Sequence, residues 1–70
     1  MPIPVHAEIS GNVWKIEVTD GARVNEGDTI MIMESMKMEI PVEAPASGTC
    51  RLSVSEGQNV QEGDLLAHVE

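Results

Sequence analysis

The stretch "VTDGARVNEGDTIMIME", residues 18–34, returns in altered form as "VSEGQNVQEGDLLAHVE", residues 54–70. Both copies contain V-x-x-G-x-x-V-x-E-G-D, and one constant offset of 36 residues relates them. A Ser-Gly pair, at residues 10–11 and 47–48, precedes each copy, and the first copy is one residue longer between this pair and the repeat. We infer an internal duplication whose two halves share one structure.

Apolar and polar residues alternate in several short segments, which is the period-2 pattern of half-buried strands. The clearest are residues 16–18, 39–43 and 52–54, and the apolar run 29–33 also fits a strand. No helical period of useful length appears, and six glycines divide the chain into pieces of strand length. Each half is too small to bury its own apolar face, so the pattern predicts a flattened all-β barrel or sandwich of about eight short strands.

The Gly-Asp pairs at residues 27–28 and 63–64 are predicted to be turns, because Gly adopts positive φ and Asp bonds to nearby backbone amides. Their carboxylates lack the dense spacing of a calcium loop. His6, His68 and Cys50 also lack metal-ligand spacing, and we interpret them as strand residues. We therefore expect no metal site.

The composition limits the size and the partners of the protein. Seventy residues are enough for one domain, residues 1–70, with a thin core. The net charge of −8 disfavours nucleic acid and anionic membrane surfaces, which attract clustered Lys and Arg. With Trp14 as the single aromatic residue, we expect a monomer that meets its protein partners transiently.

The cellular location is predicted from what the sequence lacks. Cys50 is the only cysteine, so no internal disulfide can form, and one thiol suits a reducing compartment. Neither a signal peptide nor a long apolar run is found. We expect a soluble cytoplasmic protein.

Lys37 stands out within "MESMKMEI", residues 33–40, because the chain has only four basic residues against twelve acidic ones. It falls between two predicted strands and should project into solvent from a hairpin tip. Under the offset of 36, its equivalents are positions 1 and 73, so the repeat places Lys37 at the end opposite both termini.

The chemistry open to such a lysine is that of an acceptor. A catalytic lysine needs a desolvating pocket and a partner group, and neither that nor a Ser/His/Asp grouping or a phosphate loop is visible, so the chain is not predicted to be an enzyme. An external ligase would supply the activated acyl group. Met36 and Met38 would form an adaptable apolar shoulder beside the amine. The alternative is that these two methionines only complete the core.

The segments "ESMKMEI", "P-A-S-G-T" and the two "V-x-E-G-D" motifs together resemble the biotinyl/lipoyl attachment family over nearly the whole chain. Within it, the chain resembles the small free-standing bacterial members, or else an excised carboxylase domain. The resemblance implies a barrel-sandwich hybrid of two quasi-symmetric four-stranded halves, with the modified lysine on a hairpin opposite the termini. It also implies that Lys37 is the covalent attachment site. The motif around it comprises Glu34, Ser35, Met36 and Met38.

Within this family M-K-M resembles the biotin form, whereas lipoyl domains usually have Asp before the lysine and often Ala after it. Ser35 departs from the Ala that is common in biotinyl domains, and Glu34 fits both branches. The resemblance implies that a biotin-protein ligase biotinylates Lys37, that a biotin carboxylase carboxylates the ureido ring, and that a carboxyltransferase receives the carboxyl group. Two alternatives stay open: lipoate on Lys37, attached by a lipoate ligase, and an unmodified interaction module.

Overall fold

In the computed structural model, which describes residues 2–70, the chain forms eight β-strands and no helix. The all-β prediction with about eight short strands is confirmed. The strands are β1 (Ile3–His6), β2 (Gly11–Ile16), β3 (Arg23–Val24), β4 (Thr29–Ser35), β5 (Met38–Glu43), β6 (Gly48–Leu52), β7 (Asn59–Val60) and β8 (Leu65–Val69).

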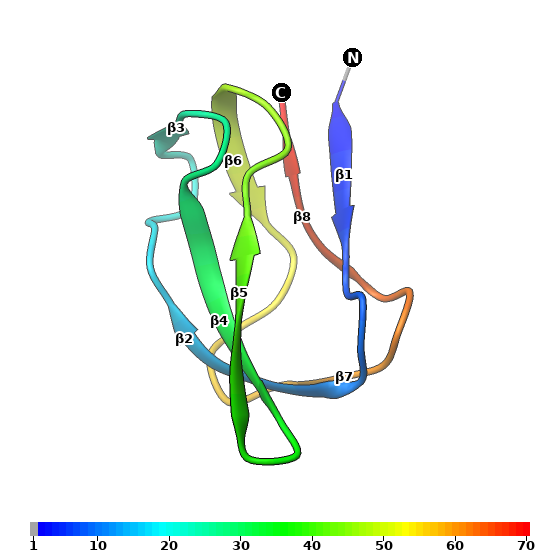
Figure 1. Cartoon of the computed structure of the whole chain (residues 1–70). Helices are drawn as coiled ribbons and strands as arrows, with labels where there is room; N and C mark the ends of the chain where they lie inside the picture. Colours follow the sequence, from blue (N-terminus) through cyan, green and yellow to red (C-terminus); the bar gives the residue numbers. More distant parts are fainter. Residues whose placement is uncertain (1) are drawn as a thin grey trace.

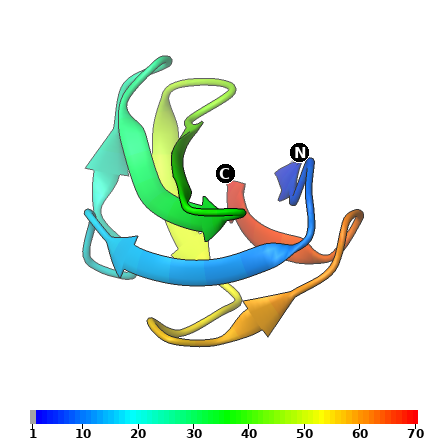
Figure 2. The ribbon, with the colours of Figure 1, turned by 60° about the horizontal axis from the view of Figure 1, so that its bottom comes forward.

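The strands build two antiparallel four-stranded sheets, in the orders β1-β8-β6-β3 and β5-β4-β2-β7. Each strand of one sheet has its counterpart at the same place in the other, as the duplication predicts. β1 and β5 are such counterparts, and both contain the triplet Ile-Pro-Val, at residues 3–5 and 40–42. The duplication therefore begins earlier in the chain than the Ser-Gly pairs. Figure 2, seen from the hairpin end, shows the strands wrapped around one interior.

Equivalent hydrogen bonds in the two halves close the E-G-D turns. The Asn25 amide donates to Asp28 Oδ2 at 2.8 Å, and the Gln61 amide donates to Asp64 Oδ2 at the same distance of 2.8 Å. The glycine before each aspartate has a φ of 90° or 92°, which a residue with a Cβ adopts only at a cost. The predicted turns at residues 27–28 and 63–64 are thus confirmed, with the role expected for each residue type.

The core lies between the two sheets and contains no aromatic side chain. Its largest fully buried residues, Ile30, Met31, Met33 and Leu66, come from β4 and β8, which are equivalent central strands. The buried apolar residues are Val5, Ala7, Val13, Val24, Ile30, Met31, Met33, Ala44, Cys50, Val60, Leu66, Ala67 and Val69.

Two of the predicted strands are misplaced. Residues 16–18 and 52–54 were expected to be strands, but β2 and β6 end at the first residue of each segment. The next residue still donates one backbone hydrogen bond to the neighbouring strand, at 2.8 and 2.9 Å, before the chain leaves the ladder. Val18 and Val54 nevertheless pack against the core. The alternation in these segments therefore reflects side-chain burial rather than strand pairing.

The extra residue of the first copy is a β-bulge in β2. Val13 is paired with Met33 and Lys15 with Ile32, so Trp14 has no partner on β4. The equivalent strand β6 runs along β8 without such an interruption. One residue is thus inserted in the first half without altering the rest of the symmetry.

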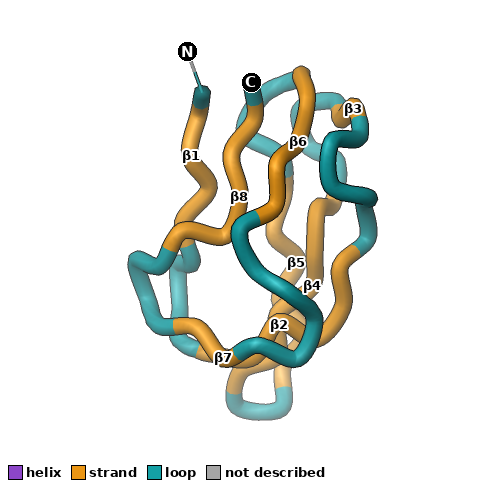
Figure 3. The backbone as a smooth tube through the Cα atoms, turned by 180° about the vertical axis from the view of Figure 1, so that it is seen from behind, coloured by secondary structure: helices purple, strands orange, loops and turns teal. Residues whose placement is uncertain are grey.

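The molecule is elongated, with extents of 32 × 19 × 18 Å and a radius of gyration of 10.9 Å. Figure 1 shows both termini at one end and the turn between β4 and β5 at the other, and Figure 3 shows the same arrangement from behind. The predicted position of Lys37, opposite the termini, is confirmed. Among residues 2–70, no helical segment has the length and apolar character needed to cross a membrane.

Candidate functional site

The site is the turn between β4 and β5, and it consists of only two residues, Met36 and Lys37. Ser35 pairs with Met38 directly before the turn closes. The φ angles of Met36 and Lys37 are 53° and 65°, and they are the only non-glycine residues with positive φ among those described. Positive φ at both central residues is the mark of a type I′ turn, which matches the right-handed twist of paired strands.

Met and Lys are not the residues that such a turn favours. Type I′ turns prefer Asn-Gly or Gly-Gly, because positive φ brings a Cβ close to the following carbonyl oxygen. A non-glycine residue held in this region costs about 1–3 kcal/mol. The strands on both sides hold the turn in place, so Lys37 is presented at the end of a rigid hairpin at some cost in stability.

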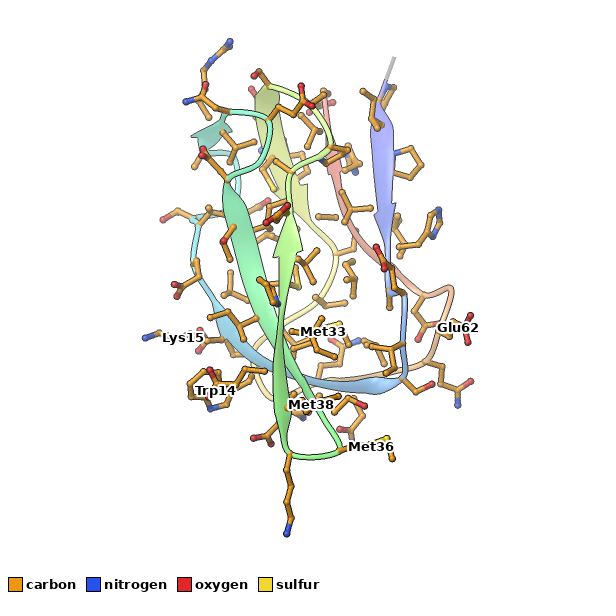
Figure 4. The ribbon with its side chains drawn as sticks, viewed as in Figure 1. Trp14, Lys15, Met33, Met36, Met38 and Glu62 are labelled. Atoms are coloured by element: carbon orange, nitrogen blue, oxygen red, sulfur yellow. The ribbon has the colours of Figure 1, made fainter. Side chains whose placement is uncertain are left out.

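The methionines separate into two groups. Met31 and Met33 are fully buried, whereas Met36 is 85% exposed and Met38 is 56% exposed. The alternative that Met36 and Met38 complete the core is therefore wrong. Figure 4 shows both of them at the hairpin end, and Met33 farther inside. Their exposure leaves them free to form the predicted apolar shoulder, whose role beside the amine stays a prediction.

Lys37 is exposed at the turn, and no ion pair within 4.0 Å joins it to any residue of the segment 2–70. A cleft of about 320 Å³ lies between the edge strands β1 and β5, with Val5 and Val42 among its lining residues. Lys37 does not line this cleft. The amine is therefore open to a partner protein and not enclosed for catalysis.

Ser35 anchors the base of the hairpin. Its side chain is buried, and its Oγ donates a hydrogen bond to the Ser10 carbonyl oxygen at 2.9 Å. At Gly11, a Cβ would lie 2.6 Å from the Glu34 carbonyl oxygen and 3.2 Å from the Ser35 Cβ, so β2 approaches β4 closely there. Of the predicted motif residues, Ser35 is therefore the buried one, and a role for any of them in binding the cofactor stays a prediction.

Glu34 and Glu39 lie directly opposite each other on β4 and β5, and both are exposed. Like charges at this spacing destabilise a strand pair. No ion pair within 4.0 Å connects either carboxylate to another residue of the described chain. The hairpin below Lys37 therefore carries negative charge that a cationic partner could neutralise.

The other candidate residues lie apart from the turn. His6 and His68 are strand residues of β1 and β8, and Cys50 is buried in β6, as predicted. Within residues 2–70 no group of three or more His, Cys, Asp or Glu side chains is arranged to hold a metal ion. Burial raises the pKa of the Cys50 thiol above its ordinary value, and the Asp20 carboxylate raises this pKa further.

Lys15, the other lysine of the chain, is exposed and has no acidic partner within 4.0 Å in the described chain. Its cross-strand partner after the bulge is the apolar Ile32 of β4, which offers no carboxylate to the ammonium.

Two features of the site could not be foreseen from the motif. The type I′ conformation at Met36 and Lys37 carries no Gly or Asn signal in the sequence. The exposure of Trp14 has one signal, the single extra residue in the first copy of the repeat. That signal locates the bulge but does not show that an aromatic side chain stays outside the core.

Comparison with known proteins identifies the family to which the chain belongs. Residues 1–69 match the biotin/lipoyl family described as "Biotin-requiring enzyme". The biotinylated protein TB7.3 homolog of Mycobacterium leprae is 45% identical over 64 residues, which cover 90% of this chain and 90% of that protein. The biotin/lipoyl attachment protein of Bacillus subtilis is 43% identical over 63 residues, or 89% of this chain and 86% of that protein.

Large carboxylases match over a small part of their length. Pyruvate carboxylase of Bacillus subtilis is 44% identical over 70 residues, and the chain spans 6% of it. The crystal structure of the Kluyveromyces lactis urea carboxylase superposes with a TM-score of 0.92 at 32% identity, over 100% of this chain and 6% of that one. Sequence and fold agree: the chain belongs to the biotin/lipoyl family, as a carrier domain and not a catalytic one.

Proposed function

We propose that this chain is a biotin carboxyl carrier whose biotin is attached to Lys37. The observation that carries the proposal is the strained two-residue turn, which presents Lys37 beyond the end of the sandwich between the exposed side chains of Met36 and Met38. The family description, "Biotin-requiring enzyme", and the names of the relatives, a biotinylated protein and several carboxylases, support biotin as the covalent cofactor.

The residues of the turn fit an amide-linked cofactor. Lys37 has no acidic partner in residues 2–70 that would have to be displaced before acylation. A biotin-protein ligase would bring the activated carboxyl carbon to Nζ. The amine gives up one proton before the attack and a second as the amide forms, while the leaving group departs from the carboxyl carbon. When attached, the cofactor supplies a ureido nitrogen that accepts and later releases a carboxyl group.

The chain itself holds the attachment site in a fixed position and moves as one rigid body. The hairpin base is fixed by the Ser35 hydrogen bond and by the close contact at Gly11, so the flexible part begins at the Lys37 side chain. A body 32 Å long with a short arm reaches two separate active sites by moving as a whole. Transient docking to a biotin carboxylase and a carboxyltransferase suits this movement. A monomer in the reducing cytoplasm, as one domain over residues 1–70, completes the proposal.

A second candidate is lipoate on the same lysine, attached by a lipoate ligase. The observation that favours it is the similarity to a biotin/lipoyl attachment protein that matches most of this chain. The two cofactors would use the same turn and the same Nζ. Because biotinyl and lipoyl groups differ in mass, one measurement separates them.

The test compares the two lysines of the chain. Wild type, Lys15→Arg and Lys37→Arg are each incubated with ATP and either biotin and biotin-protein ligase or lipoate and lipoate ligase, and the adducts are mapped by peptide mass. We expect biotin on wild type and on Lys15→Arg, and none on Lys37→Arg, because a guanidinium is not deprotonated in proteins. Lys15→Arg is the matched control, since Lys15 is also exposed and forms no ion pair within residues 2–70.

Three other outcomes would contradict the proposal. Biotin on Lys37→Arg would place the attachment elsewhere. An adduct formed only with lipoate would favour the second candidate. An unchanged mass in both reactions, with the protein folded, would favour an unmodified interaction module.

A further inference from the structure

Trp14 is the single aromatic residue of the chain, and the fold leaves it 47% exposed. The core is built without aromatic side chains, although Trp is among the largest sources of apolar burial in proteins. A small domain with a thin core gains much from burying such a side chain. Its position on the surface therefore calls for a physical explanation.

The bulge in β2 is what places Trp14 there. In the second half, Cys50 pairs with Val69 and Arg51 with His68 in consecutive order. The equivalent pairs of the first half have Trp14 inserted between them. Trp14 is thus the one residue of the strand with no counterpart in the duplicate. A bulge redirects the side chain that it carries, and such bulges are common next to functional sites.

Trp14 lies within the reach of an enzyme that works on Lys37. It follows Val13, which pairs with Met33 of β4, and Lys37 closes the turn at the level of Met36, three residues or about 10 Å beyond Met33 along the hairpin. Lys37 also begins the β5 side of the hairpin, which is two strand spacings, or about 10 Å, from β2. The two residues are therefore about 14 Å apart. A standard interface covers about 800 Å² on each partner, which is a disc of about 16 Å radius. Figure 4 shows Trp14 at the outer side of β2, toward the hairpin end.

The surface around Trp14 carries one exposed cation, Lys15, and several carboxylates. Glu34 and Glu39 lie on the adjoining hairpin. Glu56 reaches the end of β2, where its Oε2 accepts a hydrogen bond from the Ile16 amide at 2.8 Å. Across the whole chain twelve acidic residues face four basic ones. The carboxylates near Trp14 outnumber this one cation, so an arginine stacked on the indole would contact both the ring and a surface of net negative charge.

We propose that Trp14 is the docking anchor for the enzyme that acylates Lys37, which meets it with a basic, arginine-bearing surface. The proposal rests on the proposed attachment of biotin to Lys37. The acylating enzyme must bring its active site to Nζ, so it has to contact the protein around the turn. Enzymes that act on the far end of the cofactor arm have no such requirement. A large aromatic side chain in this position has the character of a binding hot spot.

Steady-state biotinylation by a biotin-protein ligase, with the carrier as the varied substrate, tests the proposal. We expect Trp14→Ala to raise the KM for the carrier about tenfold or more with kcat unchanged, and Trp14→Phe to raise it less. Added NaCl should raise the KM of the wild type, because it screens the charges. Ile3→Ala is the matched control, since Ile3 is exposed to a similar extent, 41%, at the end that carries the termini, and its KM should not change.

A second measurement does not depend on the folding of a Trp14 variant. Lys37→Arg labelled with 5-fluorotryptophan has one ¹⁹F resonance, because Trp14 is the only tryptophan. We expect this resonance to shift or broaden when the ligase is added in excess. An unmoved resonance, or a Trp14→Ala variant whose KM matches that of the wild type, would overturn the docking role while biotin on Lys37 stands. A wild type that accepts no biotin would overturn both proposals.

Discussion

Met36 and Lys37 adopt the backbone conformation of a type I′ turn without the residues that stabilise it. Both have positive φ and both carry side chains with a Cβ. An Asn-Gly pair would close the same hairpin with less strain, but it would offer no amine and no apolar flank. At the residue scale, the sequence of the turn is therefore fitted to presenting a lysine and not to stability.

Replacing both turn residues tests this conclusion. Met36→Asn combined with Lys37→Gly should raise the free energy of unfolding by about 1 kcal/mol or more, because both residues then favour positive φ. Urea unfolding measures the change. The control is Lys15→Gly, the same lysine substitution inside a strand, which should lower the free energy of unfolding by about 0.5–1 kcal/mol. A less stable turn variant would show that Met36 and Lys37 are not strained.

At the scale of elements, β2 and β6 are the equivalent strands of the two halves. They differ by the extra residue Trp14 in β2, and the bulge confines this difference to one position of the ladder. Without the bulge, an inserted residue would turn every following side chain to the other face of the sheet. The core contact of Ile16 is therefore kept in spite of the insertion.

Deleting Trp14 should leave the fold intact, because β2 would then have the uninterrupted ladder of β6. We expect cooperative unfolding with a free energy that differs from the wild type by no more than about 2 kcal/mol, measured in urea together with the spread of amide resonances. Deleting Arg51 from the regular strand β6 is the control. That deletion shifts the register and turns Leu52 away from the core, so it should abolish folding. If the two deletions behaved alike, the bulge would not be a separable insertion.

At the scale of the whole molecule, the acidic surface encloses a core with one ionisable thiol. Cys50 is fully buried in β6, and burial raises its pKa, with a further contribution from Asp20. The folded protein therefore holds this proton at a pH at which the unfolded chain releases it. At pH values below the unfolded pKa, both states are protonated and the group has no effect on stability.

The pH dependence of stability follows from this difference. As the pH rises through the unfolded pKa of about 8.5, the unfolded chain loses the thiol proton first, so the free energy of unfolding should fall. Urea unfolding between about pH 7.5 and about pH 9.5 measures the slope, and Cys50→Ala, which has no thiol, should show a smaller one. Equal slopes for the two proteins would show that Cys50 does not ionise on unfolding in this range.

The sequence by itself determined the symmetry of this protein and the place of its lysine. The repeat of V-x-x-G-x-x-V-x-E-G-D predicted two equivalent halves, their turns at residues 27–28 and 63–64, and Lys37 at the end away from the termini. These features depend on local turn chemistry and on a fixed offset along the chain, and both can be recognised in the amino-acid sequence. The family and its cofactor followed from the motif around Lys37.

Only the tertiary structure decided where strands begin and end and which side chains stay outside. Alternation misplaced the strand at residues 16–18, because an apolar period records burial and not backbone pairing. The strained turn at Met36 and Lys37 is imposed by the register and right-handed twist of β4 and β5, and β4 is held in place by its pairing with the distant strand β2. Trp14 is exposed at the bulge of β2, where it has no partner on β4. The conformational propensities of single residues do not predict these features, because each depends on how a strand pairs with its partner.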